Sequence, residues 1–253
     1  MRFATYPSLE NSNIFVTGGA SGIGRSLVEH FCAQGSRVMY IDIDGKAGAA
    51  LAEEMKAAGN RAEFAPCDVR DIAGLQTAID TFDRDAGGID VLLNNAGSDT
   101  RHAVTEVDVD YWENRMQVNL RHQFFAAQAV VPGMKRRGGG AIVNFGSVMV
   151  RMGSPGAVGY VTAKGGIEAM TRALARELGT LRIRVNCLLP GWIMTDRQIE
   201  LYLDAEGESR IAERQCIPDK LYPEDVARMA LFLAADDSAH ITSQNFIVDG
   251  GWV

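Results

Sequence analysis

Short apolar segments alternate with longer amphipathic segments along almost the whole chain, and this order constrains the fold more than any other feature. The apolar segments are rich in Val, Ile and Leu, and several lack the alternation of polar and apolar residues that marks a half-exposed strand. Such segments are typical of strands buried on both faces. The repeated strand–helix order therefore predicts an α/β fold in which helices cover both faces of a parallel sheet.

The strands and long helices can be placed directly on this pattern. The expected strands are Ile14–Thr17, Arg37–Asp42, Ala62–Ala65, Asp90–Leu93, Ala141–Phe145, Ile183–Leu189 and Phe246–Val248. The expected helices are Lys46–Ala58, Ala73–Arg84, Tyr111–Arg136, Val158–Leu178 and Pro223–Ala235. Asp108 is positioned to help cap the third of these helices, and Pro223 suits the first turn of the last.

A single domain over residues 1–253 is expected, because no linker, low-complexity segment or internal repeat divides the sequence. Only the segment 193–220, from Ile193 to Lys220, breaks the strand–helix rhythm. It is polar and carries a short helical pattern of its own. An insertion of this length in a compact domain is often a functional loop. We therefore expect a substrate lid at about 193–220.

Composition excludes several classes of partner. The net charge of −7 and the lack of a broad basic face argue against nucleic acid. The four cysteines form no CxxC pair and match no zinc spacing, so we expect free thiols in a reducing compartment and no metal site. The first residues lack the apolar core of a signal peptide, and no apolar run approaches the ~20 residues of a membrane span. These features predict a cytoplasmic protein with no membrane partner.

A glycine-rich segment, Thr17-Gly18-Gly19-Ala20-Ser21-Gly22-Ile23-Gly24, follows the first expected strand and opens a helix. Its pattern is G-x-x-x-G-x-G, not the better-known G-x-G-x-x-G. Glycines permit a tight turn and a close approach of the backbone to a pyrophosphate, while the helix N-terminus offers unpaired N–H groups. An ordinary glycine-rich turn would also fit, but the position after the first strand favours phosphate binding. The residues expected to bind are Gly18, Ser21, Gly22, Ile23 and Gly24.

Asp42 ends the second expected strand and indicates which dinucleotide binds. An acid at this place can accept both ribose hydroxyls of an adenosine and repels a 2′-phosphate. Ile43 follows it, and the glycine loop offers Ser21 where a basic side chain would be needed for that phosphate. We therefore expect NAD in preference to NADP. Asp44 competes with Asp42 for this role, and a solvated turn acid is the alternative.

Ser147, Tyr160 and Lys164 form the candidate proton-transfer set. Tyr160 and Lys164 are four residues apart and share a helix face, and Ser147 follows an expected strand near the sheet edge where ligands bind. A tyrosine phenol is a poor base near neutrality, but an ammonium and a cationic nicotinamide nearby would lower its pKa. Ser147 can hydrogen-bond the reacting oxygen while Tyr160 moves its proton and a hydride moves to or from the cofactor. Taken alone, Tyr-x-x-x-Lys is more often an ordinary helix face.

The combination of motifs is more specific than any one of them. The chain contains, in order, Thr17-Gly-x-x-x-Gly-x-Gly24, Asn94-Asn95-Ala96-Gly97, Asn119, Ser147, Tyr160-x-x-x-Lys164 and Pro190-Gly191. This set resembles the short-chain dehydrogenase/reductase family over nearly the whole sequence. The resemblance implies one Rossmann-type doubly wound sheet of about seven strands, usually in a homotetramer or homodimer, and we expect a homotetramer.

The same resemblance assigns roles by position. Asn119 would be the fourth catalytic residue, in a helix that commonly holds a water for proton relay with Lys164. The further cofactor contacts that it implies are Asp68 and Val69 at the adenine, Asn95, Ala96 and Gly97 on the adenine-ribose side, Tyr160 and Lys164 near the nicotinamide ribose, and Pro190, Ile193 and Thr195 around the carboxamide.

A narrower likeness concerns the substrate. Stretches such as Gly133–Ser147 and Met170–Gly179 look like bacterial aldose 1-dehydrogenases, closest to those acting on D-xylose and near those acting on L-arabinose, L-fucose and galactose. This implies oxidation of an aldose, expected to be a pentose, at the anomeric hydroxyl to give a lactone. The candidate substrate contacts are Asp99, Arg101, His102, Ser147, Tyr160, Trp192 and Gln198. For Arg101 and His102, pairing within the fold or across a subunit interface is the alternative.

Two other functions compete with this one. A reductase of a 3-oxoacyl thioester or another ketone, or a polyol dehydrogenase, would share the motifs; the acyl enzyme would carry an apolar cleft and often prefer NADPH. Asp42 and the polar segment from Asp99 to His102 argue against that acyl enzyme. A nucleotide-sensing protein without turnover would require a broken catalytic set, whereas every member of the set is present.

Overall fold

The computed structural model describes residues 3–253, so the first two positions of the expected domain lie outside the described residues. A seven-stranded parallel sheet with the order β3-β2-β1-β4-β5-β6-β7 forms its centre. The strands are β1 Asn13–Thr17, β2 Arg37–Asp42, β3 Arg61–Pro66, β4 Val91–Asn94, β5 Gly140–Phe145, β6 Ile183–Pro190 and β7 Asn245–Val248. This is the doubly wound sheet that the sequence predicts, and strand ends differ from the expected ones by one residue at most.

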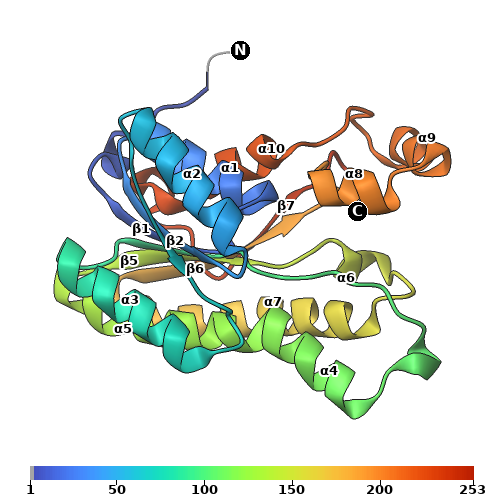
Figure 1. The fold of residues 1–253 in the computed structure, drawn as a ribbon, viewed down its shortest axis with the longest axis horizontal. Helices are drawn as coiled ribbons and strands as arrows, with labels where there is room; N and C mark the ends of the chain where they lie inside the picture. The colour runs from blue at the N-terminus through green and yellow to red at the C-terminus, as the bar shows by residue number, and fades with distance from the viewer. Residues whose placement is uncertain (1–2) are drawn as a thin grey trace.

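Helices cover both faces of the sheet (Figure 1). The helices are α1 Gly22–Ala33, α2 Gly45–Ala57, α3 Ile72–Ala86, α4 Val109–Met116, α5 His122–Arg137, α6 Met149–Met152, α7 Val158–Leu178, α8 Asp196–Tyr202, α9 Ala205–Arg214 and α10 Pro223–Ala234. One buried cluster joins α1, α2 and α10 to one face, and a second joins α3, α5 and α7 to the other. Strands β1 and β4 are buried throughout because both clusters pack on them, as their unbroken apolar sequence predicts.

The chain changes direction across the sheet between β1 and β4, which pair side by side although β2 and β3 lie between them in sequence. In an open parallel sheet a crevice forms at such a switch point, outside the carboxyl ends of the strands. The segments that follow β1, β2, β4, β5 and β6 all reach this edge. The fold therefore places the glycine loop and the candidate catalytic residues on the same side of the sheet.

The long helix expected over Tyr111–Arg136 is interrupted. The structure divides it into α4, a π-helical turn at Gln117–Arg121 and α5. A π turn inserts one extra residue into the helical repeat and is common at functional sites, and the apolar pattern alone does not reveal it. The expected caps are present: the Asp108 side chain accepts a hydrogen bond from Tyr111 N at 2.7 Å, and Pro223 opens α10.

The segment 193–220 forms two short helices, α8 and α9, where the sequence predicted one short helical pattern. Its base is closed by a bridge between Ile193 and Leu221, with Met194 N donating to Leu221 O at 2.7 Å. The chain end packs against the same segment, since Ile217 N donates to Gly250 O at 2.9 Å. In Figure 1 these helices lie beside the carboxyl ends of the strands. Within residues 3–253, no helix is both long and apolar enough to cross a membrane.

Candidate active site

A cleft of about 1390 Å³ opens at the carboxyl ends of the strands and is lined by residues of the sheet edge and of α8 and α9. All the residues that the sequence assigned to cofactor binding line this cleft: Gly18, Ser21, Gly22, Ile23, Gly24, Asp42, Asp68, Val69, Asn95, Ala96, Gly97, Tyr160, Lys164, Pro190, Ile193 and Thr195. Ser147 and the rim candidates Asp99, Arg101, Trp192 and Gln198 line it as well. Asn119 and His102 are not among the lining residues.

The glycine loop leaves no room for side chains where a dinucleotide needs backbone. A β-carbon on Gly24 would lie 1.7 Å from Gly18 O, and one on Gly22 would lie 3.0 Å from Thr195 Cγ2. Gly18 and Gly22 have φ of +67° and +53°, a region that L side chains rarely adopt. Ser21 occupies the N-cap position of α1, yet its side chain makes no capping hydrogen bond among the described residues. The open helix N-terminus and the tight loop fit a pyrophosphate.

Asn95 ties this loop to the end of β4. Its Nδ2 donates to Thr17 O at 3.1 Å and to Gly18 O at 2.8 Å, while Ala96 N donates to Thr17 Oγ1 at 3.1 Å. These contacts bind neighbouring strand ends together across the switch point. Asn95 and Ala96 therefore shape the cleft by holding the loop in place.

Asp42 and Asp44 do different things. The Asp42 carboxylate accepts from Ala20 N and from Asp44 N, each at 3.0 Å, so it is oriented into the cleft by the glycine loop and its own turn. Asp44 instead caps α2, accepting from Ala47 N at 2.9 Å. Because its carboxylate is used in the cap, Asp44 is the weaker candidate for a ribose contact.

The carboxylate of Asp68 is paired with Arg70, a partner that the sequence did not predict. Arg70 donates from Nη2 to Asp68 Oδ2 at 2.6 Å and from its backbone N to Asp68 Oδ1 at 2.9 Å. Hydrogen bonding to this guanidinium lowers the pKa of Asp68. Val69 is buried beside it. Both residues line the cleft, with the Asp68 side chain already engaged by Arg70.

Ser147, Tyr160 and Lys164 meet where β5 and α7 approach each other. Lys164, nearly fully buried, donates from Nζ to Phe145 O at 2.7 Å. The same Nζ lies 5.5 Å from the centroid of the Tyr160 ring. Ser147 Oγ accepts from Met149 N at 3.2 Å, and the Ser147 side chain lies near enough to the Tyr160 phenol to lower its pKa. The structure therefore brings the three predicted side chains together.

Burial is the main influence on the pKa values of Tyr160 and Lys164. Burial raises the pKa of Tyr160 to about 12, and the nearby Ser147 hydroxyl only partly opposes this. In the chain by itself, loss of hydration outweighs the other effects on Tyr160. The prediction that Lys164 and a cationic nicotinamide together lower the pKa of Tyr160 concerns the complex with the cofactor and stays a prediction. Burial also lowers the pKa of Lys164 to about 8, and its ammonium is directed to the Phe145 carbonyl.

Asn119 lies inside the π turn and acts on the chain beside the cleft. Its Oδ1 accepts from Ser98 N at 2.7 Å, and its Nδ2 donates to Ser98 O and Arg115 O, each at 3.1 Å. A β-carbon on Gly97 would lie 3.1 Å from Asn119 Oδ1 and 3.3 Å from Lys164 Nζ. Asn119 is thus fully buried behind Gly97, next to the ammonium of Lys164.

His102 was predicted at the rim of the cleft, but the structure places its side chain elsewhere. Its Nδ1 lies 2.9 Å from the Tyr111 hydroxyl, and its Nε2 accepts from Gly159 N at 3.4 Å. Both ring nitrogens are therefore occupied at the junction of α4 and α7, outside the cleft lining. Pairing within the fold was the alternative for this residue, and the structure supports it.

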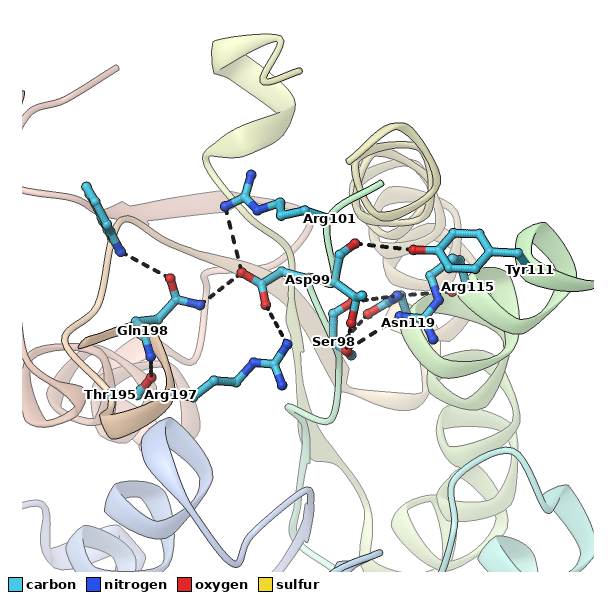
Figure 2. Close-up of polar contacts among 11 residues, drawn as sticks. Ser98, Asp99, Arg101, Tyr111, Arg115, Asn119, Thr195, Arg197 and Gln198 are labelled. Carbon is cyan, nitrogen blue, oxygen red and sulfur yellow. Dashed lines mark hydrogen bonds and ion pairs between the residues drawn. The ribbon is translucent and has the colours of Figure 1, made fainter. Parts of the chain in front are cut away.

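The remaining rim residues form a connected group (Figure 2). Asp99 Oδ2 accepts from Gln198 Nε2 at 2.9 Å, and Gln198 Oε1 accepts from Trp192 Nε1 at 3.1 Å. Arg101 and Arg197 each place Nη2 near the same carboxylate, at 3.9 Å and 3.6 Å. Arg197 was not predicted as a rim residue, although it directly precedes Gln198 and lies in the first turn of the same helix.

Trp252 is a second residue that the sequence reading missed. Its ring packs edge-on against Trp192, with centroids 6.4 Å apart, and both Trp252 and Val253 line the cleft. The end of the chain therefore covers one side of the candidate substrate pocket.

The arrangement as a whole can support proton and hydride transfer at one carbon atom. A phenol, a hydroxyl and an ammonium converge at the end of β5, and a loop suited to a dinucleotide lies at the end of β1 in the same cleft. Polar side chains that can bind hydroxyl groups surround the opening on the lid side. This combination of cofactor cradle, proton donor and polar rim is what oxidation of an alcohol requires.

Comparison with known proteins extends over the whole chain. A family model described as enoyl-(acyl carrier protein) reductase matches residues 18–253. A D-xylose 1-dehydrogenase of Caulobacter vibrioides is 44% identical over 252 residues, covering 100% of both chains. A Rhizobium meliloti protein named probable galactose dehydrogenase GalD is 44% identical, covering 97% of this chain and 96% of its own length. A solved 7α-hydroxysteroid dehydrogenase, complexed with NADH and 7-oxo glycochenodeoxycholic acid, gives a TM-score of 0.93 at 27% identity, covering 99% of this chain and 98% of that one.

Proposed function

The chain belongs to the short-chain dehydrogenase/reductase family, and we propose that it oxidises the anomeric hydroxyl of an aldose to a lactone with NAD as hydride acceptor. Membership in the family makes it an NAD(P)-dependent oxidoreductase acting on CH–OH groups. Two relatives at 44% identity, over essentially their full lengths, are named for sugar oxidation. The single observation that carries the aldose proposal is the polar group around Asp99, which lies at the opening beside Tyr160.

The chemistry follows from the three converged side chains. The sugar enters as a cyclic hemiacetal, with its C1 hydroxyl hydrogen-bonded by Ser147. The Tyr160 phenolate takes the hydroxyl proton as the C1–H bond breaks, and C1 becomes the carbonyl carbon of a lactone. When bound, the oxidised nicotinamide supplies the acceptor for the hydride and a positive charge that favours the phenolate. Lys164 and the buried Asn119 lie behind this centre and lead the proton away to water.

The residues around the cleft fit NAD. We assign the pyrophosphate to Gly18 and Ser21–Gly24, the adenine end to Asp68, Val69 and Asn95–Gly97, and the nicotinamide end to Pro190, Ile193 and Thr195. Asp42 would accept the ribose hydroxyls and disfavour a 2′-phosphate. We further propose that the enzyme is cytoplasmic and works as a homotetramer.

Reduction of a 3-oxoacyl thioester or another ketone, or oxidation of a polyol, is the competing proposal. The family model itself is described by an acyl-carrier-protein reductase, so membership in the family does not choose a substrate. An acyl chain requires an apolar cleft, whereas Asp99, Arg101, Arg197 and Gln198 place charges and amide groups at this opening. The polar opening therefore favours a sugar.

A panel of substrates tests the proposal. Purified protein is mixed with NAD⁺ or NADP⁺ and with pentoses, hexoses, polyols or secondary alcohols, and reduced cofactor is followed by its absorbance. In the reverse direction, a 3-oxoacyl thioester is offered with NADPH or NADH. We expect the highest kcat/KM with an aldose and NAD⁺. Failure of every aldose, with turnover of the thioester, would reject the proposal in favour of its competitor.

A further inference from the structure

Asp99 joins the body of the domain to the lid. It lies in the loop after β4, while Gln198 and Arg197 belong to α8, almost a hundred residues further along the chain. The Asp99 side chain is 16% exposed, so its carboxylate is largely withdrawn from bulk water although it faces the cleft. Figure 2 shows the carboxylate between Arg101 on one side and the two α8 side chains on the other. A single acidic group therefore holds contacts from both walls of the pocket.

Gln198 links this carboxylate to the rest of the lid. Its amide donates to Asp99 and accepts from the Trp192 indole, and its backbone N donates to Thr195 Oγ1 at 3.3 Å in the cap of α8. The orientation of the amide is fixed, because one end must donate to a carboxylate and the other must accept from an indole N–H. Trp192 is in turn stacked by Arg210 of α9, at 5.7 Å, and Trp252 packs on its edge.

Asp99 and Gln198 can each form further hydrogen bonds with a ligand. Within residues 3–253, the only partner of Asp99 Oδ1 is Arg197 at 3.6 Å, which is an ion-pair distance and longer than a good hydrogen bond. Arg101 is 3.9 Å from Oδ2. One N–H of the Gln198 amide is also free to donate, since each amide nitrogen carries two hydrogens. A carboxylate acceptor next to amide and guanidinium donors is suited to a pair of hydroxyl groups, because each hydroxyl both donates and accepts.

We propose that Asp99 and Gln198 select the sugar by the configuration of its hydroxyl groups away from C1, and that the same contacts hold the lid closed over it. This rests on the proposed aldose oxidation. A sugar whose hydroxyls bridge Asp99 and Gln198 completes the network between the two walls. An epimer that points one hydroxyl elsewhere leaves a buried carboxylate or amide without its partner, and unpaired polar groups of this kind give strong discrimination.

Charge explains why a carboxylate suits this place. Arg101 and Arg197 flank Asp99, so the acid is balanced by guanidinium groups from both walls. The charges of Asp99 and Arg101 also act on the pKa of Tyr160: Asp99 raises it and Arg101 lowers it. Replacing the carboxylate by an amide should therefore affect sugar selection first and the proton-transfer step second.

The test uses D-xylose and its three single epimers, D-lyxose at C2, D-ribose at C3 and L-arabinose at C4. Kinetic constants are measured for the unchanged protein, Asp99→Asn and Gln198→Met, with Glu200→Gln as a control on the exposed side of the same helix. We expect both pocket variants to raise the KM of the preferred sugar about tenfold or more and to reduce the ratio of kcat/KM between epimers to about threefold or less. The KM for NAD⁺ and the control should change by less than about twofold.

A second measurement reports on the lid without turnover. Arg210 and Arg214 are exposed on α9, so trypsin cleavage there is followed with NADH alone and with NADH plus the preferred sugar. The sugar should slow cleavage of the unchanged protein and of Glu200→Gln, but not of Asp99→Asn. The proposal would be overturned if Asp99→Asn or Gln198→Met lowered kcat/KM by the same factor for all four sugars. It would also be overturned if the sugar still protected Asp99→Asn from trypsin. Failure of the unchanged protein to oxidise any aldose would instead reject the proposed function, and this inference with it.

Discussion

The two halves of the cleft are built in different ways. The cofactor half rests on buried strands and on backbone: β1 is buried throughout, its glycine loop is held by Asn95, and a β-carbon on Gly24 would collide with Gly18 O. The substrate half rests on side chains from short, exposed helices, joined by Gln198, Arg197 and Trp192. A chemically constant ligand can be bound by the backbone of the fold, whereas a variable ligand is bound by side chains that can change without changing the fold.

Tyr160 lies where the two halves meet, so its loss should have the largest effect. Tyr160→Phe removes the proton acceptor and leaves the ring in place. Turnover should fall by at least about a thousandfold, near the upper range for general acid–base catalysis. Cofactor binding, measured by calorimetry, should change by less than about twofold, since the glycine loop does not depend on the hydroxyl. Tyr222→Phe, at an exposed tyrosine, is the control for loss of a phenol; retained activity in Tyr160→Phe would refute the role of Tyr160.

The glycine loop tests the statement that the cofactor half is made by backbone. Gly24→Ala forces a methyl group within 1.7 Å of Gly18 O, so the loop must move. We expect cofactor affinity to fall by about a hundredfold or more, with a lower melting temperature that NAD no longer raises. Gly179→Ala, at a helix end with φ of −60° and open space around it, should change neither quantity. Tight NAD binding by Gly24→Ala would contradict the assignment of this loop.

Substitutions of Asp42 and Asp44 distinguish an acid that binds the cofactor from one that stabilises a helix. Asp42→Ala should raise the ratio of NADP⁺ to NAD⁺ use by about tenfold, because it removes repulsion of the 2′-phosphate and a partner for the ribose hydroxyls. Asp44→Ala should leave that ratio unchanged and cost about 1 kcal/mol of stability through loss of the α2 cap. Steady-state kinetics with both cofactors and chemical denaturation measure the two effects. If Asp44→Ala raised the ratio and Asp42→Ala left it unchanged, the ribose contact would be assigned to Asp44 instead.

A substitution in α9, away from the Asp99 contacts, should have the smallest effect, and only on the sugar. A β-carbon on Gly207 of α9 would lie 2.7 Å from the Trp192 ring, so Gly207→Ala must displace the indole. Because the ring can shift, we expect a rise of about threefold in the KM of the sugar and an unchanged KM for NAD⁺. A larger effect on NAD⁺ than on the sugar would show that α9 belongs to the cofactor half.

The sequence predicted the cofactor half well for a physical reason. Unbroken apolar segments located every strand to within one residue, and the parallel sheet with helices on both faces followed from the strand–helix alternation. The glycine pattern, Asp42 and the Asn95–Gly97 turn were all placed correctly in the cleft, because their positions depend on strand ends. Tyr160 and Lys164 were likewise brought to Ser147 by the spacing on α7.

The substrate half was less predictable because its contacts join residues that are distant in sequence. Nothing in the local pattern at Asp99 reveals a partner at Gln198, or places Trp252 against Trp192. His102 is next to the rim in sequence, but its ring is engaged by Tyr111 and Gly159. The burial that raises the pKa of Tyr160 in the chain by itself was also not predictable, since it depends on the packing of the whole site and not on the spacing of Tyr160 and Lys164.

The central claim is that hydride leaves C1 of an aldose, and isotopic labelling tests it most directly. D-Xylose carrying deuterium at C1 is incubated with the protein and NAD⁺, and the products are analysed by NMR. The account predicts deuterium on the reduced nicotinamide, a lactone as the sugar product, and slower turnover than with unlabelled sugar if the transfer step limits the rate. Reduced cofactor without deuterium, with the label kept in the sugar, would contradict it.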